Sequence, residues 1–160
     1  MRDAEKTMKI VFQRVRRGAV SISGKRIAEI GRGAVLLVGV GQGDTASEAE
    51  WLAKKCAELR VFEDEDGRMN RSLLDIAGEV IVVSQFTLCA DVRKGRRPSF
   101  VHAAAPEIAA PLVDAFTRSL EANGIRAQTG QFGANMLVEI ENDGPVTILL
   151  EREPEVSAFS

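Results

Sequence analysis

The order of apolar and polar residues predicts strands at both ends of the chain and two helices between them. Period-two alternation marks a strand over residues 9–15 and a hairpin over residues 19–30 that turns at Gly24-Lys25. Further apolar runs predict four more strands, over residues 34–40, 79–88, 136–140 and 146–150.

Helix signals separate these strands. Thr45-Ala46-Ser47-Glu48 has the form of a capping box, and apolar residues recur behind it at helical spacing, which predicts a helix over about residues 46–59. A second helix begins at Pro106 or Pro111 and ends at Asn123-Gly124. This order predicts an α+β fold with a mostly antiparallel sheet or open barrel and two main helices.

Length and composition indicate one globular domain. A chain of 160 residues with 45% hydrophobic residues can bury roughly 70% of its unfolded surface in a single core. No repeat or linker divides it. We expect a flexible leader over residues 1–7, the folded domain over residues 8–151 and a flexible tail over residues 152–160.

The charge and the side-chain inventory exclude several function classes. Lys and Arg number 21 against 23 Asp and Glu, so a polyanion would need a local basic patch. Two cysteines and one histidine do not complete the usual zinc ligand sets, and we expect no metal and no cofactor. The apolar runs are shorter than the ~20 residues of a membrane span, which predicts a soluble, cytoplasmic protein without membrane contact.

Several short patterns are better interpreted as structure than as chemistry. The stretch Gly39-Val40-Gly41-Gln42-Gly43 suggests a phosphate-binding turn, but Asp44 stands where the dinucleotide fingerprint needs glycine, so a structural turn is favoured. His102 has no catalytic signature nearby and is interpreted as a partly exposed structural residue. Cys56 and Cys89 fit small buried hydrophobes.

Two stretches point to function from their residues alone. The apolar run of residues 79–88 turns polar at Ser84-Gln85-Phe86-Thr87, which marks a site. Directly after it, residues 91–100 concentrate four cations in a loop shaped by Gly95 and Pro98. In an acidic protein this loop favours a phosphate clamp over a solubilising surface, and Arg14, Arg16 and Arg17 are expected to extend the patch.

A third stretch is ambiguous on its own. In Asn142-Asp143-Gly144-Pro145-Val146-Thr147, Asp-Gly by itself fits a hairpin turn, but Pro145 removes an amide donor at the mouth of a strand. The residues alone do not fix the isomer of the Gly144–Pro145 bond.

Taken together, Ser84-Gln85-Phe86-Thr87-Leu88 and residues 142–147 closely resemble the motifs of the D-tyrosyl-tRNA deacylase family of D-aminoacyl-tRNA deacylases. Residues 13–15, 94–100 and 132–136 match in the family's order, and the resemblance covers approximately residues 8–151. The departures are the leader, the tail and Cys89, where a smaller residue is expected.

The resemblance implies a homodimeric hydrolase that proofreads translation by freeing D-amino acids and glycine from mischarged tRNA. It implies binding of the terminal adenosine and amino acid of aminoacyl-tRNA. It also implies a cis Gly144–Pro145 bond that reaches into the partner subunit's pocket and rejects L-amino acids. A rigid steric wall of this kind is what chirality requires, because both enantiomers carry the same groups.

We expect this site to need little acid–base or nucleophilic catalysis by side chains. An aminoacyl ester is already activated, so we expect amides of Phe86 and Thr87 to form an oxyanion hole while Ser84 and Gln85 position the ribose and ester. A covalent role for Thr87 is the less favoured mechanism, since no base accompanies it. The tRNA contacts are expected at Arg14, Lys94, Arg96 and Arg97. Alternative functions are editing of a wrong L-aminoacyl-tRNA and a non-catalytic nucleic-acid-binding module.

Overall fold

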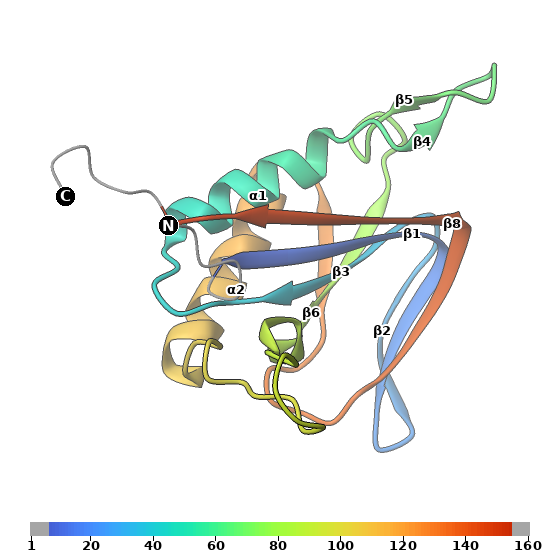
Figure 1. Cartoon of the computed structure of the whole chain (residues 1–160). Helices are drawn as coiled ribbons and strands as arrows, with labels where there is room; N and C mark the ends of the chain where they lie inside the picture. Colours follow the sequence, from blue (N-terminus) through green and yellow to red (C-terminus); the bar gives the residue numbers. More distant parts are fainter. Residues whose placement is uncertain (1–6, 155–160) are drawn as a thin grey trace, which may run out of the picture.

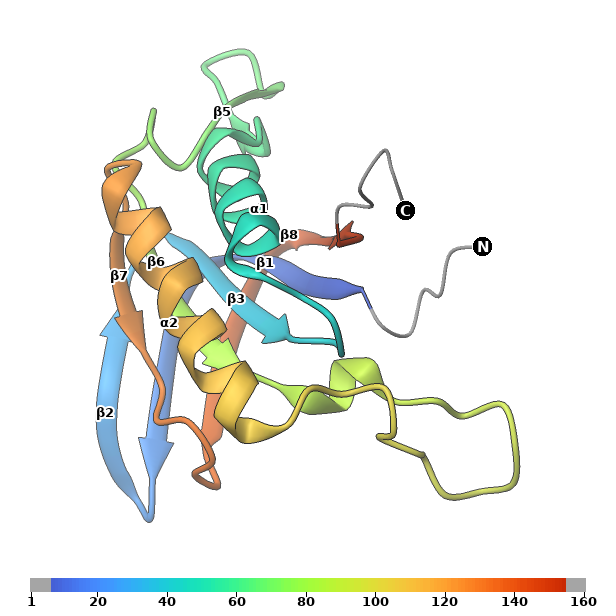
Figure 2. The same cartoon turned by 90° about the vertical axis from the view of Figure 1, so that its left-hand side faces the viewer.

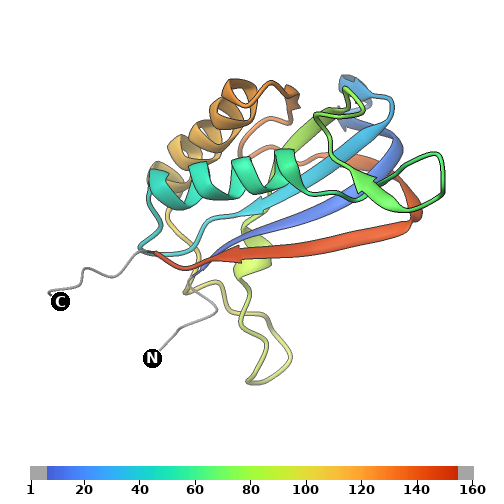
Figure 3. The ribbon, with the colours of Figure 1, turned by 90° about the horizontal axis from the view of Figure 1, so that it is seen from above.

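The computed structural model describes residues 7–154, which form one curled sheet with two helices packed on one face (Figures 1, 2 and 3). The main strands are β1 (Met8–Ile22), β2 (Lys25–Ile30), β3 (Gly33–Gly39), β6 (Glu79–Ser84), β7 (Arg126–Thr129) and β8 (Leu137–Arg152). The helices are α1 (Ala46–Glu58) and α2 (Pro106–Ala122). A short hairpin of β4 (Phe62–Glu63) and β5 (Met69–Arg71) protrudes beyond α1.

The sheet order is β2-β1-β3-β6-β7, with β8 alongside β1. Strand β1 pairs antiparallel with β2, β3 and β8, whereas β3–β6 and β6–β7 are parallel. The predicted α+β fold with a mostly antiparallel, open-barrel sheet is therefore confirmed, with two parallel pairs added. Strands β2 and β7 stand at the two ends of this strand order. The side chain of Gln128 bridges them, because its amide makes two hydrogen bonds, of 3.0 and 2.8 Å, with the backbone of Glu29.

Two apolar clusters fix the layers. The larger lies between the sheet and the helices and includes Phe12 and Leu36 from the strands, Leu52 from α1 and Phe116 from α2. The smaller lies inside the curl of the sheet, around Val35, where β2 and the first half of β8 fold over it. Burying both clusters removes a large apolar area from water, which is the dominant stabilising contribution.

Local signals placed the helices well. The capping box of Thr45 and Glu48 is formed at the start of α1, as predicted. Of the two starts predicted for α2, Pro106 is right, and Pro111 lies inside the helix. The helix ends at Ala122 and is followed by Asn123 and by Gly124 at φ +90°, the expected stop.

Three strand predictions were wrong in their limits. The first strand and the first half of the predicted hairpin are one strand, β1, because β8 pairs along nearly its whole length. The strand predicted over residues 79–88 ends at Ser84 and continues as the 3-10 turn η2 (Phe86–Cys89). The two final strands are one strand, β8, which runs through Gly144 and Pro145 to Arg152.

The predicted leader and tail lie mostly outside the described residues. Thr7 is the one leader residue described, and β8 continues one residue past the expected domain end at Glu151. Within residues 7–154, no helix is both long and apolar enough to cross a membrane.

Candidate active site

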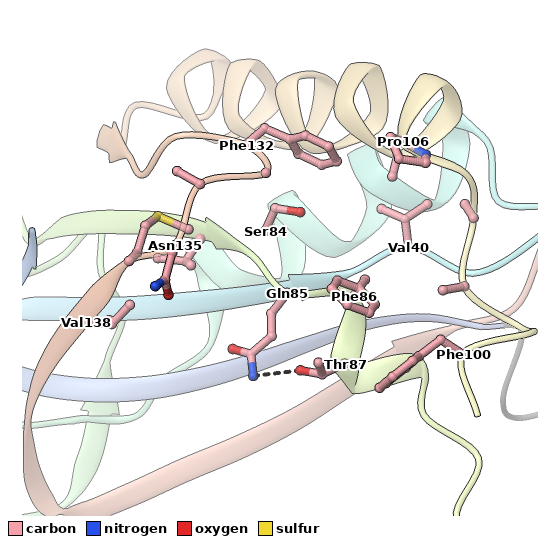
Figure 4. Close-up of a pocket in the computed structure, with 17 residues that line it drawn as sticks. Val40, Ser84, Gln85, Phe86, Thr87, Phe100, Pro106, Phe132, Asn135 and Val138 are labelled. Carbon is pink, nitrogen blue, oxygen red and sulfur yellow. Dashed lines mark hydrogen bonds between the residues drawn. The ribbon is translucent and has the colours of Figure 1, made fainter. Parts of the chain in front are cut away.

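A pocket of about 730 Å³ opens where the ends of β3 and β6 meet the segment before α2 and the segment before β8 (Figure 4). It gathers three stretches that are distant in sequence. Ser84, Gln85, Phe86 and Thr87 form one wall, residues 100–106 a second and residues 132–136 a third. The four residues that the sequence singled out at the polar end of β6 therefore lie together at one cavity.

The turn η2 gives this wall its shape. The amide of Gln85 still donates to the carbonyl of Val38 at 2.8 Å, after which the chain leaves the sheet and coils. The turn can lie against β3 because Gly39 has no side chain: a Cβ there would come within 2.8 Å of Leu88. Phe86 and Thr87 begin the turn and line the pocket, and residues at this position have no carbonyl partner earlier in the turn for their amides.

The side chains of this wall point in different directions (Figure 4). The Gln85 amide Nε2 donates to the Thr87 hydroxyl Oγ1 at 3.1 Å, so these two side chains form a unit. The Ser84 hydroxyl points away from them, toward the side of Phe132. The pocket therefore offers hydroxyl and amide groups from Ser84, Gln85, Thr87 and Asn135 beside the aromatic rings of Phe86, Phe100 and Phe132.

Acid–base groups are missing from this lining. Every residue that lines the pocket lies within the described range, and none is His, Cys, Asp, Glu, Lys or Arg. His102 is partly buried, with Nε2 3.7 Å from Oδ2 of Asp91, whose pKa Arg93 holds well below its usual range. Cys89, the last residue of η2, is buried, and burial raises the pKa of its thiol; burial also raises the pKa of Cys56 to about 12. Both cysteines match the predicted small buried hydrophobes.

Gly144 and Pro145 do not line this pocket. They stand exposed on β8, and the peptide bond between them is cis, as the family resemblance implied. Gly144 has φ +125°, and a Cβ there would approach Nη2 of Arg14 to 3.0 Å, so glycine is required where the backbone passes the guanidinium. Within one chain the structure does not bring the two predicted parts of the site together.

The predicted basic patch is also divided. Lys94, Arg96 and Arg97 are exposed and have no ion-pair or hydrogen-bond partner among residues 7–154. Their loop projects from the body (Figure 2), and its base is closed by two hydrogen bonds between the backbones of Asp91 and Ser99, of 2.7 and 2.8 Å. A cavity beside it is lined by Asp91, Arg93, Lys94 and Ser99.

The arginines of β1 do not extend that patch, contrary to the prediction. Arg14 is only 5% exposed, and its guanidinium donates to the carbonyls of Asp143 at 3.0 Å and Val61 at 2.8 Å. A tRNA phosphate cannot reach a group enclosed in this way. Arg16 pairs with Asp143, and Arg17 bonds three glutamates.

Sequence reasoning left several lining residues without a role. Phe100, Phe132 and Asn135 stood in stretches that were quoted for the family resemblance, but the sequence alone gave no reason to place them at a site. The structure brings them to the pocket, and the rings of Phe86 and Phe100 meet edge to face with centroids 4.9 Å apart. Aromatic residues that remain exposed after folding are a signal that could have identified them: Phe86 is 55%, Phe132 40% and Phe100 36% exposed.

Comparison with known proteins decides the family. The model of the D-Tyr-tRNA(Tyr) deacylase family matches residues 11–151. The chain belongs to this deacylase family. It is accordingly a hydrolase that acts on ester bonds, and the resemblance and the enzyme class expected from the sequence are confirmed.

Relatives of the deacylase family match along nearly the whole chain. The D-aminoacyl-tRNA deacylase of Roseiflexus castenholzii is 60% identical, over 92% of this chain and 96% of its own. That of Thermomicrobium roseum is 58% identical, over 90% and 94%. Among solved structures, the c-Myc DNA Unwinding Element Binding Protein has 43% identity and a TM-score of 0.85, with 91% of this chain and 99% of its own covered. A probable eukaryotic D-amino acid tRNA deacylase shares the fold, with 19% identity and a TM-score of 0.78 over 91% and 100%.

Proposed function

We propose that this chain, as a homodimer, hydrolyses the ester that joins a D-amino acid or glycine to tRNA and rejects L-aminoacyl-tRNA through Gly144 and Pro145. The observation that supports the proposal is the pocket itself: Phe86 and Thr87, at the start of η2, line it, and no titratable side chain does. Such a site suits a substrate that is activated already and needs orientation and charge stabilisation more than proton transfer.

The amides of Phe86 and Thr87 are the proposed oxyanion hole. When water or the ribose hydroxyl attacks the ester carbon, negative charge moves onto the carbonyl oxygen, and two fixed N–H donors stabilise it there. One such donor is worth about 10² to 10³ in rate. Ser84 and Gln85 are proposed to position the ribose and ester, since both line the same wall.

Thr87 is proposed as a positioning group rather than a nucleophile. Its hydroxyl accepts the hydrogen bond from Gln85, and the residues around the pocket include no base that could remove its proton. Trapping the enzyme with substrate and searching by mass spectrometry for an acyl group on Thr87 tests this choice. An adduct on Thr87 would establish covalent catalysis in place of direct hydrolysis.

The chiral gate requires a second copy of the chain, because Gly144 and Pro145 lie outside the pocket of their own chain. A row of paired apolar residues supports a dimer: Leu149, Val11, Leu37 and Val83 are neighbours across β8, β1, β3 and β6. This row leads from the exposed Leu149 to Val83 at the pocket wall. A twofold partner that covers it would bring its own β8 toward this pocket.

Arg14 is proposed to position the gate rather than to bind tRNA. Its bond to the Asp143 carbonyl and its approach to Gly144 fix the backbone just before Pro145, while its bond to Val61 fixes Arg14 itself. A gate that discriminates by shape must hold its place to a fraction of an ångström, because a wall that yields cannot separate enantiomers.

The tRNA is proposed to meet the aromatic rings and the projecting loop. Phe86, Phe100 and Phe132 are half-exposed around the pocket and suit stacking of an unpaired terminal adenosine, since aromatic rings stack on any base. Lys94, Arg96 and Arg97 are left to neutralise phosphates nearer the tRNA body. No metal or cofactor takes part in the proposed reaction.

The deciding experiment compares release of D-tyrosine, L-tyrosine and glycine from tRNA by the wild type and by Pro145→Ala. We expect the wild type to favour D-tyrosine over L-tyrosine by at least about 100-fold, or about 2.8 kcal/mol, and also to release glycine. We expect Pro145→Ala to reduce that ratio, because alanine does not fix φ and has no ring to form the wall. Equal hydrolysis of both tyrosine enantiomers by the wild type would contradict the gate.

Two other functions are distinguished by adding L-seryl-tRNA and a binding measurement to that assay. Turnover of L-seryl-tRNA without D-tyrosyl-tRNA would indicate editing of a wrong L-amino acid. Salt-dependent binding without any ester hydrolysis would indicate a nucleic-acid-binding module, an alternative favoured by the unpaired cations of the loop and by the name of the 43% identical structural relative.

A further inference from the structure

The second wall of the pocket, residues 100–106, lies mostly in the segment of residues 99–105, which precedes α2 and forms neither a helix nor a strand of the sheet. This wall carries Phe100, Ala103 and Ala104 into the pocket. Two backbone hydrogen bonds tie it to the chain just beyond β3: the amide of Ala104 donates to Val40 and the amide of Gln42 donates to His102, both at 3.0 Å. These two bonds hold the wall beyond Phe100, and the two backbone bonds between Ser99 and Asp91 hold it just before Phe100.

The side chain of Gln42 adds a hydrogen bond directly after Phe100. Its Nε2 donates to the carbonyl of Val101 at 2.6 Å, and Val101 follows Phe100 directly. Phe100 in turn meets Phe86 of the ester-binding turn edge to face. Gln42 is exposed, so its contribution lies in this hydrogen bond and not in core packing.

The turn that carries Gln42 is itself fixed. Oδ2 of Asp44 accepts a hydrogen bond from the amide of Gly41 at 2.7 Å, and the amide of Asp44 donates to the carbonyl of Gly41 at 3.3 Å. Asp44 is buried, whereas Gln42 points outward from the same turn. A side chain on so constrained a turn can hold the neighbouring segment in place, because the turn itself does not yield.

We propose that Gln42 is a positioning residue for the deacylation: its side-chain amide holds the Phe100 wall at the distance from η2 that the terminal nucleotide requires. Gln42 is not among the residues that line the pocket and acts through Val101 and Phe100. A wall that grips the nucleotide equally before and during the reaction contributes uniform binding, so its loss raises KM and leaves kcat unchanged. This inference rests on the proposed hydrolysis of D-aminoacyl-tRNA.

The first test is kinetic. We expect Gln42→Ala to raise KM for D-tyrosyl-tRNA about fivefold, the effect of one lost hydrogen bond, with kcat within about twofold of the wild type. We expect Gln42→Glu to raise KM further, because its carboxylate would face the Val101 carbonyl with no donor between them. The matched controls are Gln131→Ala and Gln131→Glu. Gln131 is an exposed glutamine beside Phe132 whose side chain makes no hydrogen bond within residues 7–154.

The second test measures how firmly the wall is held when no substrate is bound. Hydrogen exchange of residues 99–105 in the free protein should accelerate severalfold in Gln42→Ala and stay at the wild-type rate in Gln131→Ala, with equal melting temperatures. An active wild type in which Gln42→Ala matches Gln131→Ala in both KM and exchange overturns the inference, as does a loss confined to kcat. A wild type that hydrolyses no D-aminoacyl-tRNA overturns the proposed function instead, and the role of Gln42 in the reaction fails with it.

Discussion

The cations of β1 and those of the loop over residues 91–99 look alike in sequence, but the fold treats them in opposite ways. On β1, Arg14 donates to two backbone carbonyls, and Arg17 bonds glutamates of β2 and β8. On the loop, Lys94, Arg96 and Arg97 have no such partner among the described residues. A cation whose donors are satisfied holds the protein together, whereas one without partners is available to a ligand.

This difference explains how a protein with a net negative charge can bind a polyanion such as tRNA. The net charge is −2, so long-range attraction to RNA is absent from the molecule as a whole. Arg14, Arg16 and Arg17 each lie within 4 Å of carboxylates of the same chain, which offset their positive charge. The loop projects from the body (Figure 3) and carries Lys94, Arg96 and Arg97, which have no partner among residues 7–154, so the favourable potential is concentrated in one place.

Arg14→Ala is expected to have the largest effect. The carbonyls of Asp143 and Val61 would lose a charged donor in a buried place, so we expect the free energy of unfolding to fall by about 3 kcal/mol. We also expect deacylation to fall more than tenfold, because the backbone before Pro145 is released. Denaturant unfolding and single-turnover kinetics measure these effects, with Arg14→Lys as the variant that keeps the charge and loses the two-carbonyl geometry. An unchanged free energy of unfolding with a raised KM would instead indicate that Arg14 binds phosphate, as the cations of the loop are proposed to do.

Replacing Lys94, Arg96 and Arg97 together by alanine should produce the opposite signature. We expect KM for aminoacyl-tRNA to rise about tenfold at low salt and the slope of log KM against log salt to flatten by about 2, since up to three phosphate contacts are lost. The melting temperature should not change. Lys25→Ala, on the exposed tip between β1 and β2, is the control for removing a cation elsewhere. An unaltered salt slope in the triple variant would show that the loop does not contact phosphate.

Sequence reasoning predicted what local chemistry decides. The capping box of Thr45 and Glu48, the α1 stripe and the Gly124 stop depend on residues a few positions apart, and each formed as expected. The change in polarity at Ser84 also located a real cavity wall. It could not reveal that the chain coils there, because η2 is set by the contact of Leu88 with Gly39, nearly fifty residues earlier.

The missing parts of the site depend on distant contacts. The guanidinium of Arg14 is not available to a ligand because it donates to the carbonyls of Val61 and Asp143. These contacts are distant in sequence, and no local pattern predicts them. Phe132 reaches the pocket because β7 pairs in parallel with β6, and a four-residue strand leaves almost no periodic signal. The family motifs supplied the position of Gly144 and Pro145, whereas the residues alone suggested a hairpin turn.

Asp44 extends the comparison to a negative charge that the fold buries without fully satisfying it. Its Oδ1 has no hydrogen-bond partner within the described residues, and burial raises its pKa to about 7, an effect that Glu48 of α1 increases and Lys9 of β1 opposes. The folded state therefore prefers the protonated form. The contribution of the protonated Asp44 carboxyl to the free energy of unfolding is complete below the ordinary carboxyl pKa. It is lost as the pH rises through about 7.

We therefore expect the wild type to lose about 2 kcal/mol of unfolding free energy relative to Asp44→Asn between pH 4 and pH 8. Thermal melts of both proteins across that range measure the difference, which corresponds to several degrees for a chain of this size. Glu48→Gln separates the contribution of the neighbouring carboxylate. A gap between the two melting curves that is constant with pH would show that Asp44 is ionised throughout and fully accommodated.

The smallest effect is expected from Arg17→Ala. Arg17 donates at 3.0 to 3.1 Å to Glu29, Glu139 and Glu141, and these bonds hold the pKa of Glu29 below its usual range. All of these groups face water, and Arg26 also pairs with Glu29 and Glu139, so much of the network persists without Arg17. We expect the melting temperature to fall by less than about 2 °C at low salt and the difference to vanish at 1 M salt. The difference should also shrink below pH 4, as Glu29 takes up its proton. A fall above about 5 °C that persists in salt would mean that partnered charges stabilise this sheet even where they are exposed to water, as strongly as the buried Arg14 does.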